Sequence, residues 1–172
     1  MLVSLRNYSN YSICESNIKI DDLVNFASKN NLSAIGLTDY KLLSGSLEFS
    51  IKCQKAGIQP ILGLDIDYVS TLTHSKRLTF LSKSEVGFKN LNILSTEVNT
   101  NNNFLLNKNN IKDYANGNIL ILGGLYSYFE DISINQKNLT KVLKEIKNLK
   151  EIFKNDLFFE YDPNLNNILL KE

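Results

Sequence analysis

The sequence predicts an α/β fold in which strands and helices alternate along the chain. Short apolar runs at Leu2–Leu5, Leu32–Leu37, Pro60–Leu64 and Asn118–Leu122 predict strands. Segments with apolar residues three and four positions apart lie between them, a pattern typical of β–α–β units and of a parallel sheet, closed or open. Each run also ends at a polar or small residue, and in a β/α barrel that rim is where functional side chains gather.

Three helices are expected in the first part of the chain from their capping residues and apolar spacing. Asp21 and Asp22 favour the start of the first helix. Ser44 suits the N-cap of the second, which Gly57 closes, and Ser84 suits the N-cap of the third. The residues expected to face inward are Leu23, Phe26, Ala27 and Asn30 in the first helix, Leu47, Ile51 and Ala56 in the second, and Phe88, Leu91, Ile93 and Leu94 in the third.

The rest of the chain continues the same alternation. Tyr68–Leu72 and Leu78–Leu81 predict two short extended runs on either side of a polar turn. The stretch from Asn99 to Asn110 predicts a long loop, because asparagine competes for backbone hydrogen bonds and favours turns. The strongest helix is expected over Leu139–Phe153, where apolar residues keep a spacing near 3.6. A last strand is expected at Leu157–Glu160.

Composition indicates one ordinary globular domain spanning residues 1–172. The chain is 43% hydrophobic and 22% charged, which is typical of a folded domain rather than a disordered one. Its formal net charge of +1 provides no general attraction to nucleic acid or to an anionic membrane. Any contact with DNA is therefore expected to be indirect.

Cysteine usage and hydropathy indicate a cytoplasmic protein. Cys14 and Cys53 lack CxxC spacing and are expected to be buried thiols. No apolar run approaches the roughly 20 residues that span a membrane. The first residues lack the charged start and long apolar core of a signal peptide.

The residues at the strand ends resemble those of a known family. They are Arg6-Asn7-Tyr8-Ser9, Thr38-Asp39-Tyr40, Asp65 and Gly123-Gly124, and they are supported by the block Lys55-Ala56-Gly57-Ile58-Gln59-Pro60-Ile61-Leu62-Gly63. Together they resemble the PHP (polymerase and histidinol phosphatase) domain at the N-terminus of the bacterial DNA polymerase III alpha subunit. The resemblance implies a distorted, TIM-like β/α barrel that this chain covers incompletely at its C-terminal end, without the polymerase domains.

The resemblance also implies a metal site whose ligands have changed. Family members bind zinc, manganese or iron through histidine and carboxylate, and the parent polymerase uses magnesium. The equivalent positions here are Arg6, Tyr8, Glu15, Tyr40, Asp65, Asn99 and Gly124, and Asp39 occupies a supporting position. Only Glu15 and Asp65 keep ligand chemistry.

Arg6 weighs against a metal cluster most strongly. A guanidinium stays charged and has no lone pair to offer a metal. Placed about 4 Å from a divalent ion, it costs roughly 8 kcal/mol at an effective dielectric of about 20. We therefore expect no catalytic residue and no bound metal cofactor in this chain. We expect Arg6 to fill the vacated space, paired with Asp65 or Glu15 and flanked by Tyr8 and Tyr40.

Simpler interpretations stand beside these for several residues. Tyr8 and Tyr40 would then be aromatic residues that pack at the rim, and Asp39 a cap for the next loop. His74 would be exposed and inert in its turn. Gly123-Gly124 lacks the spacing of a phosphate-binding loop. The lysines of Leu139–Phe153 would be a solvated helix face, with contact to a polyanion as the less favoured alternative.

Three functions remain open at this point. The resemblance favours a non-catalytic module of the polymerase III core, in DNA replication, that docks the proofreading exonuclease subunit. The alternative is a metal-dependent PHP phosphoesterase with a reduced metal site. The third is a decayed fragment with no independent role.

Overall fold

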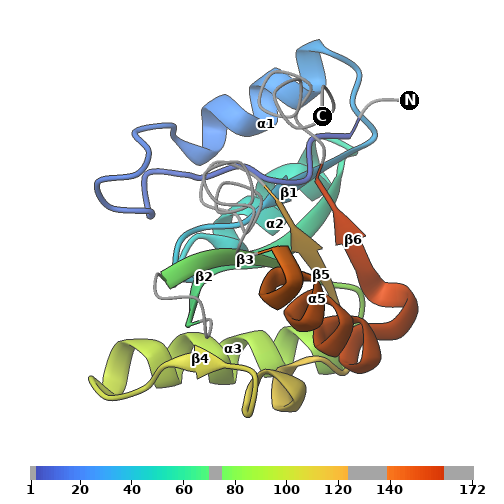
Figure 1. Ribbon diagram of the computed structural model, residues 1–172. Coiled ribbons are helices and arrows are strands. Elements are labelled where there is room, and N and C mark those ends of the chain that lie inside the picture. Colours follow the sequence, from blue (N-terminus) through green and yellow to red (C-terminus); the bar gives the residue numbers. More distant parts are fainter. Residues whose placement is uncertain (1–2, 70–74, 124–138, 161–172) are drawn as a thin grey trace.

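The computed structural model describes residues 3–69, 75–123 and 139–160 (Figure 1). The expectations for His74 and Gly124 therefore lie outside the described residues. The helices are α1 Ile20–Lys29, α2 Ser46–Lys55, α3 Glu85–Thr100 and α5 Leu139–Phe153, with 3-10 turns η1 Ile111–Tyr114 and η3 Lys154–Asp156. The strands are β1 Ala34–Leu37, β2 Gln59–Val69, β3 Ser75–Ser82, β4 Leu106–Asn107, β5 Asn118–Leu122 and β6 Leu157–Phe159.

The strands form one mixed sheet in the order β1-β2-β3-β5-β6, with β4 beside β2. Pairs β1–β2, β2–β4 and β5–β6 are parallel, as expected. Pairs β2–β3 and β3–β5 are antiparallel, so the prediction of a parallel sheet is wrong at the centre. The reason is the short connection after β2, because residues 70–74 are too few for the crossover that parallel neighbours need.

Strand β2 is longer than its apolar run. It continues past Leu64 to Val69, so Asp65 lies inside the strand and not at its end. From Gly63 onward each residue of β2 faces one of β3, and Asp65 lies opposite Thr79. Side chains two residues apart share a face of a strand. Asp65 and Asp67 therefore point to the same side.

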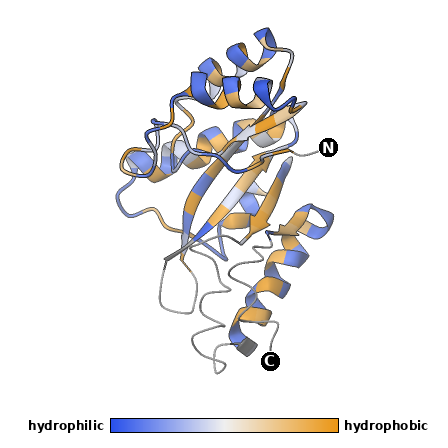
Figure 2. Ribbon diagram, turned by 90° about the horizontal axis from the view of Figure 1, so that it is seen from above, coloured by the Kyte–Doolittle hydropathy of each residue, from blue (hydrophilic) through white to orange (hydrophobic). Residues whose placement is uncertain are grey.

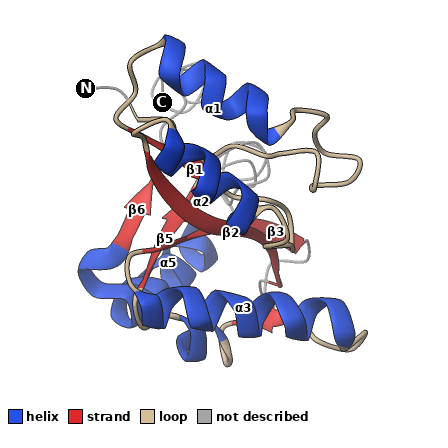
Figure 3. Ribbon diagram, turned by 180° about the vertical axis from the view of Figure 1, so that it is seen from behind, coloured by secondary structure: helices blue, strands red, loops and turns tan. Residues whose placement is uncertain are grey.

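Helices cover the sheet in two groups, each with its own apolar core. Figure 3 shows α2 lying across β1 and β2 with α1 beyond it, and α3 at the opposite end. Ile35, Phe49 and Cys53 belong to the core beneath α1 and α2, and all three are fully buried. Leu64 and Phe80 belong to the larger core against α3 and α5. Burial raises the pKa of the Cys53 thiol to about 11, because the thiolate would lose its hydration.

Several predicted termini are confirmed. Gly57 has a φ of 70°, the left-handed value expected where it closes α2, and Asn31 has a φ of 52° after α1. The Ser84 hydroxyl accepts a hydrogen bond from the Gly87 N–H at 3.1 Å and caps α3. Helix α5 has the predicted bounds, and in Figure 2 apolar and polar residues alternate along it as in an amphipathic helix.

Some predicted helix faces are wrong. Helix α2 begins at Ser46 with Gly45 at its N-cap, not at Ser44, so its buried stripe is Ser46, Phe49 and Cys53. Four apolar residues expected inside are at least 43% exposed, namely Phe26, Leu47, Ile51 and Ile93. Asn30 and Ala56, also expected inside, are exposed as well. In each case the apolar spacing was compatible with two adjacent helix faces, and packing against the sheet selected the other one.

The N-terminal segment lies beside β1 without forming a ladder. Ser4 makes a single bridge with Ile35, and the Gly36 N–H donates to the Ser4 carbonyl at 2.7 Å. A Cβ at Gly36 would come within 2.0 Å of the Leu5 carbonyl oxygen, so the close approach requires glycine here. The strand predicted at Leu2–Leu5 is therefore reduced to one bridge in the described residues. This contact fixes the position of Arg6.

Two further expectations need correction. Cys14 is exposed, because it lies at a φ of 66° in the turn that follows Tyr11. The stretch predicted as a loop from Asn99 to Asn110 instead carries the last residues of α3 and the short strand β4. No helix within the described residues combines the length and apolarity needed to cross a membrane.

Candidate functional site

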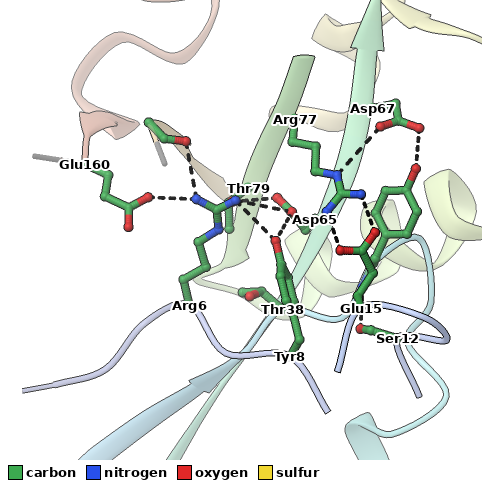
Figure 4. Close-up of polar contacts among 12 residues, drawn as sticks. Arg6, Tyr8, Ser12, Glu15, Thr38, Asp65, Asp67, Arg77, Thr79 and Glu160 are labelled. Atoms are coloured by element: carbon green, nitrogen blue, oxygen red, sulfur yellow. Dashed lines mark hydrogen bonds and ion pairs between the residues drawn. The ribbon is translucent and has the colours of Figure 1, made fainter. Parts of the chain in front are cut away.

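The site centres on Asp65, which is fully buried in the middle of β2. The Tyr8 hydroxyl donates to Asp65 Oδ2, and the Thr79 hydroxyl donates to Asp65 Oδ1 at 2.7 Å. Arg6 Nη2 lies 3.4 Å from Oδ2 (Figure 4). Burial raises the pKa of Asp65, and the charge of Arg6 and the two hydroxyl donors offset part of that rise. A buried carboxylate is thus held by one cation and two hydroxyl groups.

Arg6 reaches this position from the N-terminal segment and satisfies four acceptors. Its Nη1 donates to Glu160 Oε2 at 2.8 Å and to the Gly123 carbonyl at 3.3 Å. Its Nη2 donates to the Tyr8 hydroxyl oxygen at 3.2 Å and to Asp65 at 3.4 Å. Arg6 therefore ties the chain start to β2, to the end of β5 and to the residue after β6.

The charge balance of this group keeps Arg6 protonated and Tyr8 neutral. Burial by itself lowers the pKa of Arg6, but the negative charge of Asp65 and the contacts with Tyr8 and Glu160 outweigh it, so the pKa lies above its ordinary value. Burial, with the nearby charge of Asp65, raises the pKa of Tyr8 to about 12. At neutral pH Tyr8 is therefore a hydroxyl donor.

A second arginine organises the neighbouring cluster. Arg77 Nη1 and Nη2 donate to Glu15 Oε2 and Oε1 at 3.0 and 2.5 Å, a two-point pairing. The Arg77 guanidinium carbon lies 4.0 Å from the centroid of the Tyr40 ring. The Tyr40 hydroxyl donates to Asp67 Oδ2 at 2.5 Å, and Lys41 Nζ lies 2.6 Å from the same atom. Figure 4 shows Arg77, Glu15 and Asp67 beside the Arg6 group.

Of the two partners expected for Arg6, the structure pairs it with Asp65 and pairs Glu15 with Arg77. The hydrogen bond from Arg77 comes first among the causes that lower the pKa of Glu15. Tyr8 contacts Arg6 directly, whereas Tyr40 stacks on Arg77.

Asp39 holds the loop beneath the site. It is 1% exposed and accepts hydrogen bonds from the Ser9 N–H at 2.6 Å, the Ser9 hydroxyl at 2.7 Å and the Ser12 hydroxyl at 2.6 Å. The Ser12 hydroxyl also accepts from the Tyr40 N–H at 2.9 Å. These hydrogen bonds of Asp39 go to the earlier loop at Ser9–Ser12, whereas the simpler interpretation expected a cap for the loop that follows Asp39.

Asn99 lies apart from these clusters. It is exposed on α3, and its amide donates to the Lys41 carbonyl at 2.8 Å and to the Ser95 carbonyl at 2.7 Å. It tethers α3 to the loop after β1 rather than approaching Asp65.

The donor set does not fit a bridged metal cluster. In residues 3–69, 75–123 and 139–160, no three histidine, cysteine, aspartate or glutamate side chains converge as a metal-binding group. Bridged divalent ions need several carboxylates and imidazoles with free lone pairs. The oxygens of Asp65 are instead occupied by Arg6, Tyr8 and Thr79.

Arg77, Asp67 and Glu160 belong to the site but were not anticipated from the sequence. A polar–apolar alternation could have indicated the residues on β2 and β3. It occurs in Asp65-Ile66-Asp67 and in Arg77-Leu78-Thr79, and it places their polar residues on one face of an antiparallel pair. The signal was missed because Asp65 was interpreted as the end of its strand.

The sheet is mixed and flanked by helices, and polar residues gather beside the ends of β1 and β5. These features are typical of α/β proteins whose functional site lies at the rim of the sheet. The model of the PHP domain family matches residues 4–164, and this chain belongs to that family. It has an α/β fold, and its described strands form one mixed six-stranded sheet.

Relatives named DNA polymerase III subunit alpha match most of the chain. The protein from Borreliella burgdorferi is 30% identical over 92% of this chain and 15% of its own length. The protein from Bacillus subtilis is 27% identical over 99% of this chain and 15% of its own length. The chain thus spans about 15% of these relatives. A solved amidohydrolase from Chromobacterium violaceum, 14% identical, has a TM-score of 0.48 over 66% of this chain and 35% of its own, too low to add to the family assignment.

Proposed function

We propose that this chain is the PHP module of a replicative DNA polymerase III alpha subunit and that it has a structural and docking role without hydrolytic activity. The relatives that match most of the chain carry that polymerase name. The observation that carries the non-catalytic part is the ion pair between Arg6 and Asp65, reinforced by the Tyr8 hydroxyl.

The chemistry of phosphoester hydrolysis explains why this pair matters. Metal ions in such sites lower the pKa of a bound water and stabilise charge on the phosphoryl oxygens. Arg6 supplies positive charge but cannot coordinate or activate a water. Its side chain is 17% exposed, so little room remains beside Asp65 for both Arg6 and a hydrated cation.

The same proposal includes the setting and the partner. We place the module, as one domain over residues 1–172, in the cytoplasm within the polymerase core. There it binds the proofreading exonuclease subunit and meets DNA mainly through the rest of the core. A PHP domain without hydrolytic metals leaves proofreading to a separate subunit, which gives the docking role its purpose.

Binding to the exonuclease tests the docking role. The 172-residue chain would be immobilised and titrated with the exonuclease subunit from the same organism, with an unrelated α/β protein of similar net charge as control. We expect a Kd in the nanomolar range for the chain and no binding by the control. Absence of a complex at micromolar concentrations would contradict docking.

Phosphatase assays test the enzyme alternative. Manganese- or zinc-dependent release of phosphate from p-nitrophenyl phosphate, abolished by Asp65→Asn and kept by Asp113→Asn, would establish a phosphoesterase. Asp113 is an exposed carboxylate away from the site and serves as the matched control. We expect no metal-dependent release by either variant or by the parent chain. Glu15 and Asp65, the remaining ligand-type residues, already belong to separate arginine pairs.

A further inference from the structure

A tight turn between η1 and β5 contains an asparagine followed by a glycine. The pair is Asn116-Gly117, and no other asparagine of the sequence precedes a glycine. A hydrogen bond from the Asn118 N–H to the Ala115 carbonyl at 3.1 Å closes the turn. Asn116 is exposed, so water reaches its side-chain amide. The turn precedes β5, whereas Arg6 contacts the residue after the end of that strand.

An asparagine side chain can react with the backbone nitrogen that follows it. The Gly117 nitrogen bonds to the side-chain carbonyl carbon of Asn116 and gives up its proton, and the side-chain nitrogen leaves as ammonia. Water then opens the resulting five-membered imide at either of its two carbonyl groups. One opening gives aspartate. The other gives isoaspartate, in which the main chain runs through the former side chain, and neither route needs an oxidant or a reductant.

Gly117 leaves the attacking nitrogen accessible. A residue with a Cβ would crowd its own nitrogen, and glycine has none. Gly117 has a φ of 77°, and a Cβ there would lie 2.3 Å from the Ser84 hydroxyl oxygen, so the turn requires glycine. Within residues 3–69, 75–123 and 139–160, the Gly117 N–H donates no hydrogen bond. No acceptor therefore has to release this nitrogen before it attacks.

The two carbonyl groups of the pair are held from the side of α3. The Asn116 carbonyl accepts a hydrogen bond from the Asn90 amide at 2.9 Å, and the Gly117 carbonyl accepts one from the Lys83 N–H at 3.0 Å. Closing the imide turns the Asn116 carbonyl and costs the bond to Asn90. That bond is exposed, so water can replace it at little net cost.

Isoaspartate in this turn would disturb its contact with α3. It adds one carbon atom to the main chain between Ala115 and Gly117. A Cβ at Gly87 would lie 2.0 Å from the Gly117 carbonyl oxygen, so the turn and the start of α3 are already in close contact. The longer main chain displaces Gly117 and weakens its bond from the Lys83 N–H. Aspartate keeps the length of the main chain, so only isoaspartate should destabilise the fold.

We propose that Asn116 is a site of spontaneous deamidation, at which attack by the Gly117 nitrogen and hydrolysis by water form isoaspartate and aspartate in the folded chain. The proposal rests on the exposed amide, the glycine that follows it and the backbone nitrogen without an acceptor. This modification site goes beyond the docking function and does not depend on it.

Ageing of the purified 172-residue chain tests the proposal. The folded chain would be kept in mildly alkaline buffer, digested and mapped by mass spectrometry, with isoaspartyl methyltransferase to label isoaspartate. We expect Asn116 to lose its amide several times faster than Asn102, which is exposed but precedes another asparagine. The rate should rise with pH, because the attacking nitrogen gives up a proton. The melting temperature should fall as isoaspartate accumulates.

Two variants and an unfolded sample complete the test. Asn116→Gln can close only a six-membered imide, which forms far more slowly, so its melting temperature should stay constant during ageing. The matched control Asn102→Gln should age like the parent. A parent sample in urea reports the reaction of the open chain. Loss of the Asn116 amide in urea but not in the folded chain would overturn the proposal, as would loss in neither sample or equal loss at Asn102 and Asn116.

Discussion

At the scale of single residues, the pairing of Arg6 with Asp65 is the central feature. Asp65 has no exposed surface, and its carboxylate accepts hydrogen bonds from neighbouring side chains. A buried ion pair adds little net stability compared with an apolar pair, but removing one partner leaves the other charge uncompensated. Removing one partner of the pair is therefore expected to lower the free energy of unfolding strongly, and removing both charges is expected to lower it less.

Arg6→Ala is expected to destabilise the chain by about 2–4 kcal/mol, because Asp65 loses its only direct ion pair within the described residues. The double variant Arg6→Ala/Asp65→Asn should recover part of this loss, since the amide carries no charge. Urea denaturation of the four members of the cycle measures both effects.

Lys89→Ala is the matched control for Arg6→Ala. It breaks an exposed pair with Glu85, in which the side chains are 69% and 82% exposed, and such a pair contributes little in water. A loss after Arg6→Ala no larger than the loss after Lys89→Ala would contradict the structural role of Arg6.

The penalty of Arg6→Ala should grow as pH rises. Burial raises the pKa of Asp65, and Arg6 counteracts part of that rise, so removing Arg6 raises the folded-state pKa further. In the variant, folded Asp65 then holds its proton at pH values where the unfolded chain has lost it, and stability falls as pH rises through that interval. Unfolding free energies should differ less between parent and variant near pH 5 than near pH 8. A difference that is constant with pH would contradict this assignment.

Only part of the residue-level site could be predicted. Arg6, Tyr8 and Asp65 could be selected because they follow apolar runs in the sequence, and the structure brings them together. Glu15 and Tyr40 join a different arginine, because the partner Arg77 comes from a strand whose register was not known. Asn99 could not be placed, since its contact with the Lys41 carbonyl depends on how α3 packs.

At the scale of elements, the β2–β3 hairpin decides how the site is built. Opposed pairs Asp65–Thr79 and Asp67–Arg77 put complementary side chains directly across from each other. The sequence predicted strand character on both sides of the turn, but it placed the end of β2 at the first aspartate. Polar residues inside a strand cannot be told from loop residues by hydropathy alone, so the length of β2 depends on pairing.

Gly36→Ala tests the seating of the N-terminal segment on β1. The added methyl would meet the Leu5 carbonyl oxygen at 2.0 Å, so the segment would have to move and the hydrogen bond from Gly36 to Ser4 would weaken. We expect a destabilisation of about 3 kcal/mol and faster amide exchange at position 36.

Ser33→Ala is the matched control for Gly36→Ala, because Ser33 is exposed just before the same strand. It should change stability by less than about 0.5 kcal/mol. Equal stability of the two variants would show that the segment is not seated as described.

At the scale of the whole molecule, the α/β class and the order of helices and strands were predictable from apolar spacing and caps. The mixed sheet was not, because strand direction depends on the connection and on tertiary pairing rather than on local sequence. The predicted buried faces of helices were wrong where exposed apolar residues such as Leu47 have the spacing of a buried face. Two groups of helices pack on one sheet and shape its rim. Arg6 links the N-terminal segment to β2, to the end of β5 and to the residue after β6.

The metal content of the purified chain tests the central claim most directly. The chain would be purified without chelators, supplied with manganese, iron or zinc, desalted and measured by elemental analysis beside Asp65→Asn. Because Arg6, Tyr8 and Thr79 occupy the oxygens of Asp65, we predict well below one equivalent of each metal per chain in both samples. One or more equivalents in the parent chain, lost in Asp65→Asn, would contradict the account.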